Sequence, residues 1–412
     1  MASQTRTTYQ PSDLGQRVHF PYYAWMRGEG IPIHFEVAGV SDITEVPRAP
    51  WARTGKGKGV FLELDGTYQA ERGMFVCEIP PGQSLDVQHH LYEQFTLIMQ
   101  GNGTTEIWQK DGPKRTFEWG KGSLFAPPKN TYYRMHNLGS EPVLYFGVTT
   151  APRLMNGMFP SGGGTGSGVS TTSQFEYVFT SDHDFRELYD GGETYFARSD
   201  DRHIATAAPT KENGYGGNVW YTNYIPDVYE ETVDPRNHKV AGGRVTGYRM
   251  AGGFPMGHLG EWPVGRYHKA HYHGPGAVLV GLKGHGYVNL WPHELGPHPW
   301  QEGHGDQVEL VEWGVNSIYV PPDGYWHQHM STGNVPARHV AVYGGALPLM
   351  TRGRADGDGE TDLSIPYSEG GRLLDYEDED PEVRRYFIEA NRREGVECTM
   401  PPVTYRTLPT NR

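Results

Sequence analysis

The chain contains an internal duplication. The segment PGQSLDVQHHLYEQFTLIMQGNGTTEIW (81–108) resembles VGRYHKAHYHGPGAVLVGLKGHGYVNLW (264–291); among the matching pairs are Gly82 and Gly265, His90 and His273, Gly101 and Gly284, and Trp108 and Trp291. Further along, EWGKGSLFAPPKN (118–130) matches EWGVNSIYVPPDG (312–324), and the second copy is 11 residues longer between its matching segments, around 292–307. Because similarity on both sides of an insertion rarely arises by chance, we expect two structurally equivalent units.

Each copy consists of short stretches in which apolar and polar residues alternate, separated by Gly, Pro, Asn and Asp. Examples from the first copy are MFVCEI, QFTLIMQ, TTEIWQ and PVLYFGV. The chain has 55 glycines and 31 prolines, and 12% of its residues are aromatic. Turn residues between closely spaced strands are typical of sandwiches and barrels, so the sequence predicts an all-β fold.

The duplication also predicts the domain organisation. The stretch PSGGGTGSGVSTTS between the copies has the composition of a flexible linker, and irregular, polar sequence follows it. We therefore expect an N-terminal domain (1–159), a connecting segment (160–235), a C-terminal domain (236–350) and a C-terminal extension (351–412).

One helix is predicted in the extension. Asp380 is a suitable N-cap, Pro381 suits the first helical position, and Gly395 is a suitable stop. The acidic run DYEDED before the helix is expected to be a solvated surface and no metal site.

Charge and composition exclude several classes of function. The formal net charge of −13 argues against a general nucleic-acid or membrane-surface binder, since both need a basic surface. No stretch approaches the roughly 20 apolar residues of a membrane helix, and the N-terminus lacks the apolar core of a secretory signal. Cys77 and Cys398 are too few for a disulfide framework, so we expect a cytoplasmic location.

The second copy carries a candidate metal site. His271 and His273 are two residues apart, so in a strand they point to the same face. His327 follows a Pro-Gly turn and can supply a third nitrogen. Three neutral imidazoles suit a divalent first-row metal and leave coordination positions open for a substrate, so we expect these residues to be metal ligands.

These residues also resemble the two motifs of the cupin superfamily, G-x5-H-x-H-x3,4-E-x6-G and P-x-G-x2-H-x3-N. The matching positions are Gly265, His271, His273, Gly284, Pro322, Gly324 and His327. The resemblance covers roughly 75–155 and 258–350 and departs from the pattern at Ala277, where the motif has a metal-binding Glu, and at Ser331, where it has Asn. It implies a bicupin: two double-stranded β-helix (jelly-roll) barrels with short helical additions.

The first copy has lost most of the candidate ligands. Gln88, Gln94 and Tyr133 stand at the positions of His271, Ala277 and His327, and only His90 is kept. We expect the N-terminal barrel to be structural or to help close a dimer. A rearranged site that uses His90 and Glu93 remains an alternative.

Other candidate residues surround the predicted metal. His329 shares a strand face with His327 and is the predicted catalytic acid/base, because histidine titrates near neutrality, although it is also a possible fourth ligand. Tyr267, Lys269 and Tyr325 are predicted to face the substrate, and Lys269 would pair either with an anionic substrate or with a buried carboxylate. His268 is left out of the site, because strand alternation turns it away unless a bulge intervenes. The histidines of the inserted loop and its start are expected to be exposed: His285, His293, His298 and His304.

The ligand set suggests a chemistry. A metal held by three neutral imidazoles keeps more positive charge than one held with a carboxylate, so it favours an anionic chelating substrate. The resemblance is to the three-His iron dioxygenases that cleave gentisate and salicylate rings. It implies Fe(II), with Mn, Ni or Zn as alternatives, O2 as co-substrate, a small anionic aromatic or enolic substrate, and a homo-oligomer. A metal-dependent lyase or isomerase that uses no O2, and a non-enzymatic ligand-binding bicupin, are the alternatives.

Overall fold

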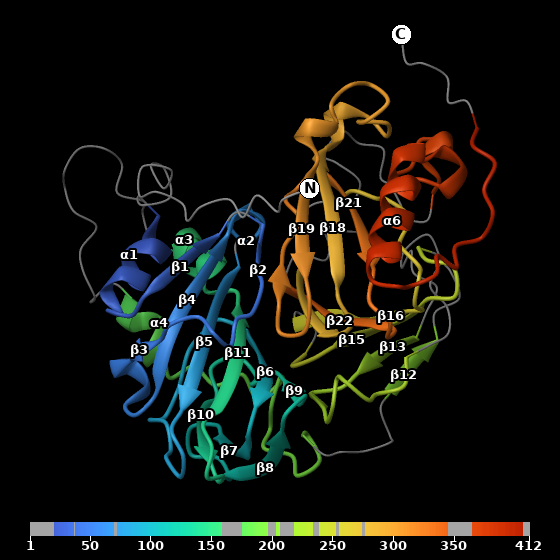
Figure 1. Ribbon diagram of the computed structural model, residues 1–412. Helices are drawn as coiled ribbons and strands as arrows, with labels where there is room; N and C mark the ends of the chain where they lie inside the picture. The colour runs from blue at the N-terminus through green and yellow to red at the C-terminus, as the bar shows by residue number, and fades with distance from the viewer. Residues whose placement is uncertain are drawn as a thin grey trace, which may run out of the picture.

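The computed structural model describes residues 20–36, 38–69, 72–158, 175–196, 203–206, 218–233, 239–252, 255–273, 277–344 and 365–406. These residues form two β-barrels side by side (Figure 1). Each barrel consists of a large sheet and a small sheet whose strands are mostly antiparallel. The prediction of an all-β fold with two jelly-roll barrels and short helices is confirmed. The expected Gly/Ser linker lies outside the described residues.

The N-terminal barrel has an eight-stranded sheet facing a three-stranded one. The large sheet has the order β1 (Ile33–Glu36), β4 (Lys58–Leu64), β5 (Gly73–Ile79), β11 (Val143–Thr149), β6 (Gln94–Gln100), β9 (Leu124–Phe125) and β14 (Tyr224–Ile225), and β3 (Ala49–Pro50) pairs with β4. The small sheet has the order β10 (Tyr132–Asn137), β7 (Asn102–Trp108) and β8 (Arg115–Gly120). All four strands quoted from the first copy are therefore present.

The C-terminal barrel repeats this arrangement. Its large sheet has the order β12 (His203–Thr206), β13 (Asn218–Tyr221), β15 (Arg244–Arg249), β16 (Pro255–Trp262), β22 (Ala337–Gly344), β17 (Val278–Lys283), β20 (Ile318–Tyr319) and β2 (Gly39–Val40). Its small sheet has the order β19 (Glu309–Trp313), β18 (Gly286–Pro292) and β21 (Tyr325–Ser331). The order of the central strands matches that of the first barrel, as the duplication predicts.

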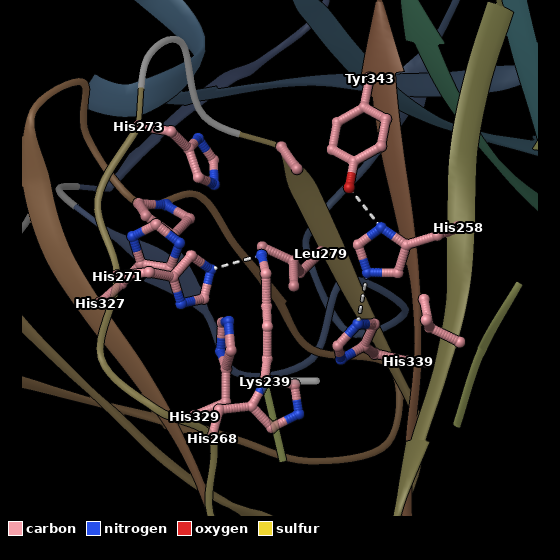
Figure 2. Close-up of a pocket in the computed structure, with 14 residues that line it drawn as sticks. Lys239, His258, His268, His271, His273, Leu279, His327, His329, His339 and Tyr343 are labelled. Atoms are coloured by element: carbon pink, nitrogen blue, oxygen red, sulfur yellow. Dashed lines mark hydrogen bonds between the residues drawn. The ribbon is translucent and has the colours of Figure 1, made fainter. Parts of the chain in front are cut away.

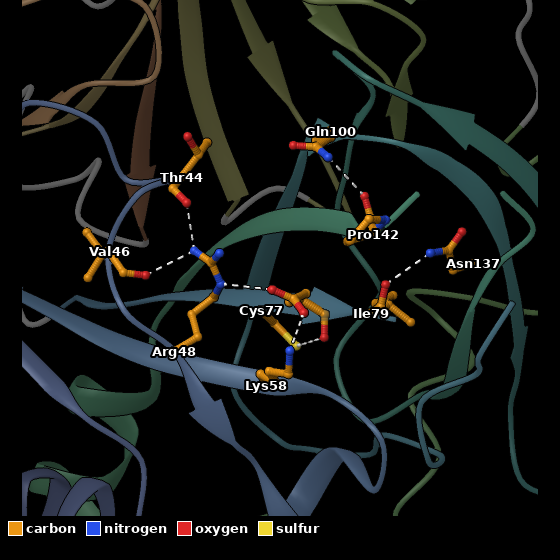
Figure 3. Close-up of polar contacts among 10 residues, drawn as sticks. Thr44, Val46, Arg48, Lys58, Cys77, Ile79, Gln100, Asn137 and Pro142 are labelled. Atoms are coloured by element: carbon orange, nitrogen blue, oxygen red, sulfur yellow. Dashed lines mark hydrogen bonds and ion pairs between the residues drawn. The ribbon is translucent and has the colours of Figure 1, made fainter. Parts of the chain in front are cut away.

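The two barrels exchange their edge strands. The N-terminal β2 pairs with β20 of the C-terminal barrel, and β14 pairs with β9 of the N-terminal barrel. The segment that follows β2 returns to the first barrel, where Arg48 Nη1 donates to the carbonyls of Thr44 and Val46 at 2.8 and 3.0 Å (Figure 3). Arg48 Nε also donates to Glu78 at 3.3 Å. Each of these sheets thus ends in a two-residue strand, and such short edge strands limit edge-to-edge aggregation.

The largest apolar cluster is shared by both barrels. It includes Val60, Val76 and Phe146 from the first barrel together with Val280 and Val340 from the second, all almost fully buried. At about 25 cal/mol per Å² of apolar surface, burial of this kind is the main force that holds the barrels together. The barrels are therefore two halves of one packed body.

The segment between the two copies contributes to both barrels. Its sequence shows no regular pattern, yet its described parts include a helix, α4 (Glu176–Thr180), and the strands β12, β13 and β14. These strands are short and pair only at the edges of sheets formed by other segments. Their structure depends on tertiary pairing, which local sequence does not reveal.

Helices cover the outside of the barrels. The remaining helices are α1 (Pro21–Gly28), α2 (Asp65–Gln69), α3 (Ala151–Met158) and α6 (Pro381–Arg393), and the 3-10 turns are η2 (Ala52–Thr54), η4 (His293–Leu295), η5 (Gly305–Gln307), η6 (Tyr367–Glu369) and η7 (Tyr376–Asp378). The helix predicted in the extension is confirmed as α6, with the Asp380 side chain accepting from the amide of Glu382 at 3.0 Å. None of the described helices is long and apolar enough to cross a membrane.

The prediction that DYEDED is a solvated surface is wrong for its second half. Asp378, Glu379 and Asp380 are at most 2% exposed. Glu379 accepts from the Tyr267 hydroxyl and from Gln328 Nε2, and Asp380 accepts from the amides of the inserted loop at Trp300 and Gln301. Through these hydrogen bonds the acidic run holds the C-terminal extension and the inserted loop against the C-terminal barrel. Its partner Gln328 is next to His327 in β21.

Candidate metal centre

An extended segment and the strand paired with it bring the three candidate ligands together. His271 and His273 lie in the extended segment between β16 and β17, and His327 lies in β21. The backbones of His271 and His327 are paired, with N–H···O distances of 3.2 and 2.9 Å in the two directions. One ligand atom from each of the three imidazoles lies within 4.8 Å of the others, and all three side chains are buried (Figure 2). Among the described residues, this is the one such cluster of His, Cys, Asp or Glu.

Hydrogen bonds fix which nitrogen is available in two of the three imidazoles. His271 Nδ1–H donates to the Lys269 carbonyl and His327 Nδ1–H donates to the Tyr325 carbonyl, both at 3.0 Å. Each bond leaves the Nε2 lone pair for another partner, as in metal-binding histidines held by backbone carbonyls. His273 Nδ1 is buried without a hydrogen-bond partner. His271 and His327 therefore present a free Nε2 lone pair in the form that a metal requires.

The electrostatic setting keeps these imidazoles neutral. Burial lowers the pKa of His327 to about 3 and lowers the pKa of His271 and His273 well below the usual value. Lys239 acts in the same direction on all three, and neighbouring imidazoles do so on His271 and His273. Protons therefore do not compete for the lone pairs at neutral pH. The donor set fits a divalent transition metal, and the sequence-based ligand prediction is compatible with this geometry.

The histidines line a small cavity of about 30 Å³. Its walls are formed by Lys239, Val245, His258, Gly260, His268, His271, His273, Ala277, Leu279, Pro321, His327, His329, His339 and Tyr343. No Asp or Glu is among these described lining residues. Ala277 stands in the wall, at the position where the cupin motif has Glu, and adds no charge.

Lys239 was not found by sequence reasoning. It lies just before β15, is 6% exposed, and its Nζ is 2.9 Å from Nε2 of His271 (Figure 2). It belongs to no motif and is far from the histidines in sequence. Only the three-dimensional packing of this segment against the ligand strand brings it to the site.

The structure also adds His268 to the cavity. Tyr267 pairs with Met330, and His271 pairs with His327. The ligand segment therefore has three residues between its two paired positions, whereas β21 has two. This one-residue irregularity acts as a bulge and lets His268 and His271 face the same side. Simple alternation, on which His268 was left out, therefore does not hold here.

Two further histidines form a hydrogen-bonded chain across the cavity. His258 and His339 are joined through their Nε2 atoms at 3.1 Å, and His258 Nδ1 bonds to the hydroxyl of Tyr343 (Figure 2). They lie on the paired strands β16 and β22. Neither is in a recognised motif, although both follow the inward alternation of their strands.

The other predicted site residues lie in different places. His329 lines the cavity, and its Nδ1 is 2.9 Å from the Tyr319 hydroxyl. Burial and the neighbouring His268 and His327 lower its pKa well below the usual value, so the near-neutral titration expected for it does not apply. Tyr325 is half-buried at the start of β21 and does not line the cavity.

Tyr267 and Lys269 face away from the cavity. Lys269 Nζ pairs with Asp375 at 2.5 Å, and Tyr267 bonds to Glu379 beneath α6. The expectation that they look inward failed because the bulge reverses the faces of this segment. Of the two partners considered for Lys269, the structure shows the carboxylate. Of the four loop histidines, His285 is exposed, whereas His293, His298 and His304 are half-buried and none lines the cavity.

The first barrel has no comparable site among its described residues. His90 is buried, its Nδ1 donates to the Tyr92 carbonyl at 2.8 Å, and its Nε2 accepts from the Tyr133 hydroxyl at 2.9 Å. Glu93 lies 3.4 Å from Lys129. Tyr133 thus occupies the position of the missing third ligand and satisfies the one remaining imidazole. The rearranged site around His90 and Glu93 does not assemble in this part of the structure.

Comparisons with known proteins give distant likenesses only. No protein-family model matches the sequence. No curated protein sequence matches it significantly either. The structure is similar to oxalate decarboxylase from Bacillus subtilis, at 11% identity, with 74% of this chain and 76% of that chain covered and a TM-score of 0.44. It is also similar to vicilin from Corylus avellana (hazelnut), at 14% identity, with 75% and 85% covered and a TM-score of 0.44. These values are too low to bear on reaction, metal or substrate.

Proposed function

We propose that this protein is a metal-dependent bicupin enzyme, an iron(II) dioxygenase that acts on a small, anionic, chelating molecule. The observation that carries the proposal is the convergence of three neutral imidazoles on a buried cavity with no acidic residue among its described lining. Bound iron(II) would supply open coordination positions for the substrate and O2 and would allow electrons to pass from the substrate, which is oxidised, to O2. Manganese, nickel and zinc remain compatible with the same donors.

The charge of the cavity supports an anionic substrate. A divalent ion held by neutral ligands in a buried site lacks charge compensation, and burying uncompensated charge is costly. Ala277 adds no carboxylate at the position where the cupin motif has one. A carboxylate or enolate on the substrate would provide the missing negative charge.

The volume of the cavity favours a small substrate. About 30 Å³ is roughly twice the space that a single buried water needs, so an aromatic ring requires lining side chains to move. Val245, Leu279 and Pro321 form apolar walls that keep bulk water away. Among the substrate classes considered, an enolised small acid is therefore favoured over an aromatic ring.

His329 is proposed to handle a proton during turnover. Its Nδ1 is occupied by the Tyr319 hydroxyl, so Nε2 is the nitrogen left for a bound molecule. With a strongly lowered pKa, it would act as a neutral hydrogen-bond partner that accepts a proton only transiently. The neighbouring Tyr319 hydroxyl can relay that proton.

A lyase or isomerase that uses no O2 is the second candidate. It is favoured by Lys239, because an amine beside the ligand set is a suitable acid/base group for Lewis-acid chemistry. The two reactions differ in their need for oxygen.

Anaerobic turnover tests the choice between them. Protein purified without oxygen is analysed for its metals, loaded with iron(II), and incubated with small enolisable and dicarboxylic acids with and without O2. The dioxygenase proposal expects binding but no conversion without O2, and stoichiometric O2 uptake with it. His329→Ala should lower turnover at unchanged metal content, with His285→Ala as the exposed control. Complete conversion without O2 would reject the dioxygenase and favour the lyase or isomerase.

A further inference from the structure

We infer that the C-terminal extension is a structural part of the metal centre, in which Asp375 and Glu379 position the strands that carry the metal ligands. The inference rests on the proposed function, since it needs a bound metal, and goes beyond it by naming the residues that hold the ligands in place. Asp375 and Glu379 do not line the cavity, so they act through the strands and touch neither metal nor substrate.

The first observation is that the segment carrying His271 is paired on both of its edges. On one edge His271 pairs with His327 of β21. On the other edge it pairs with Leu373 of the extension, and the Leu374 amide donates to the Ala270 carbonyl at 2.8 Å. The extension therefore pairs with the outer edge of the ligand segment as a further strand would. A shift of His271 would break backbone hydrogen bonds on both edges.

The second observation concerns the group that orients the His271 ring. His271 Nδ1–H donates to the Lys269 carbonyl at 3.0 Å, and the Lys269 amine is 2.5 Å from a carboxylate oxygen of Asp375. Groups that accept a hydrogen bond from a metal-binding histidine fix the orientation of its ring, and their loss typically weakens metal binding by about 10–100-fold. Asp375 holds the residue that provides such a group.

The third observation is that one buried carboxyl group connects both strands that carry ligands. Glu379 is 2% exposed, accepts from the Tyr267 hydroxyl and accepts from Gln328 Nε2 at 3.1 Å. Tyr267 belongs to the same segment as His271, and Gln328 directly follows His327 in β21. Glu379 therefore sets the position of the two strands relative to each other, next to the ligands of both.

These polar contacts differ from those that attach the extension to the barrel. The helix α6 lies beside β21 (Figure 1), and its Val383 and Phe387 are buried in an apolar cluster with Met330 of β21. Apolar burial is non-directional, whereas hydrogen bonds depend on distance and angle. The apolar cluster is thus suited to hold the extension in place, and the contacts of Asp375 and Glu379 are suited to fix the geometry of the ligand strands.

Cobalt(II) binding to the full-length protein tests the inference. The Kd is measured by competition with a chelator, and the visible absorption of bound cobalt reports the number and arrangement of its ligands. The variants are Asp375→Ala, Glu379→Leu and the conservative Glu379→Gln. Asp380→Ala is the matched control, because Asp380 belongs to the same buried acidic run but accepts from the amides of Trp300 and Gln301 in the inserted loop, at 2.9 Å each. Urea unfolding of the metal-free variants identifies those that are folded.

The expected result is a loss of metal affinity that does not follow stability. In Asp375→Ala and Glu379→Leu the Kd of cobalt should rise about tenfold or more, with a changed visible spectrum. Glu379→Gln should stay within about threefold of the wild type, because the amide keeps the size and the hydrogen-bonding ability of the carboxyl group. Asp380→Ala should lower the free energy of unfolding but leave the Kd and the spectrum unchanged, since a residue that only stabilises the fold does not alter binding to protein that is already folded.

Two failures are distinguishable. Wild-type protein that binds no cobalt would overturn both the metal centre and this inference. Wild-type binding together with an unchanged Kd and spectrum in folded Asp375→Ala and Glu379→Leu, or an equal loss of affinity in Asp380→Ala, would overturn the positioning role alone. If Glu379→Leu does not fold, Tyr267→Phe takes its place, because it removes one hydrogen bond of Glu379 and keeps the aromatic ring.

Discussion

Acidification should destabilise the metal-free protein below about pH 6.5, because its buried histidines must remain neutral to stay folded. Burial lowers the pKa of His90, His327 and His339 to about 3. In the unfolded chain the same groups titrate near 6.5, so the unfolded state takes up protons first as the pH falls. The stabilising contribution is therefore complete above pH 6.5 and declines until the folded-state pKa is reached.

The magnitude follows from the pKa differences. At pH 5, about 1.5 units below the unfolded value, each of these three imidazoles costs about 2 kcal/mol, or about 6 kcal/mol together. The remaining cavity histidines act in the same direction: His258, His268, His271, His273 and His329. Whole domains are stable by only about 5–15 kcal/mol, so the effect is large.

Carboxyl groups whose pKa is raised by burial oppose this trend, namely Glu36, Glu93, Asp378 and Glu379. Burial raises the pKa of Glu379 to about 8, so it is protonated in the folded state and favours folding as the pH falls. Between pH 7.5 and 5 this adds about 3 kcal/mol. Because the five other cavity histidines add to the loss, the net loss of unfolding free energy over this interval should still be at least about 3 kcal/mol.

Equilibrium urea unfolding, followed by tryptophan fluorescence in the presence of a chelator, measures this at about pH 7.5, 6.5, 5.5 and 5. His90→Gln should reduce the acid-induced loss by about 2 kcal/mol, because it removes one titrating group far from the cavity. His285→Gln is the control, since His285 is exposed. Equal unfolding free energies at the two ends of this pH range, or an unchanged loss in His90→Gln, would refute the reasoning.

Three further predictions concern the metal and the pairing of the barrels. His271→Ala should abolish metal content measured by elemental analysis, whereas Tyr133→Phe should leave it intact; stoichiometric metal in the first variant would contradict the assignment. Ala277→Glu should place a carboxylate in the cavity and raise the Kd of oxalate about tenfold, and tighter oxalate binding would contradict the charge argument. A fragment ending near residue 160 lacks β14 and half of the shared core, so size-exclusion chromatography should show self-association, and a well-behaved monomer would count against tight pairing.

The strands were predictable because their information is local. QFTLIMQ is a short, mainly apolar run followed by turn residues, and it is the buried strand β6 in the structure. The connecting segment was not predictable, since β13 and β14 exist only through pairing with distant strands. The prediction for the acidic run was wrong because Glu379 is buried against Tyr267 and Gln328, to which no local sequence pattern links it.

The residues of the candidate site were also predictable only where the information is local. His271 and His273 follow from spacing within one strand, and their pairing with His327 follows from the motif. The position of His268 depends on a one-residue bulge, which the sequence does not mark. Lys239 depends on how a separate segment packs, so it becomes visible only when the chain is folded.

The strand exchange has a consequence for the order in which the chain is synthesised. Gly39 emerges from the ribosome early, but its partner Tyr319 is translated only after most of the chain. Until then the β2 segment has no strand to pair with, and the first barrel also lacks β14, which arrives with Tyr224. Long-range pairing of this kind slows folding, and domains tend to fold as they emerge. We therefore expect the nascent first barrel to expose an unpaired strand edge during translation and to bind a chaperone at that stage.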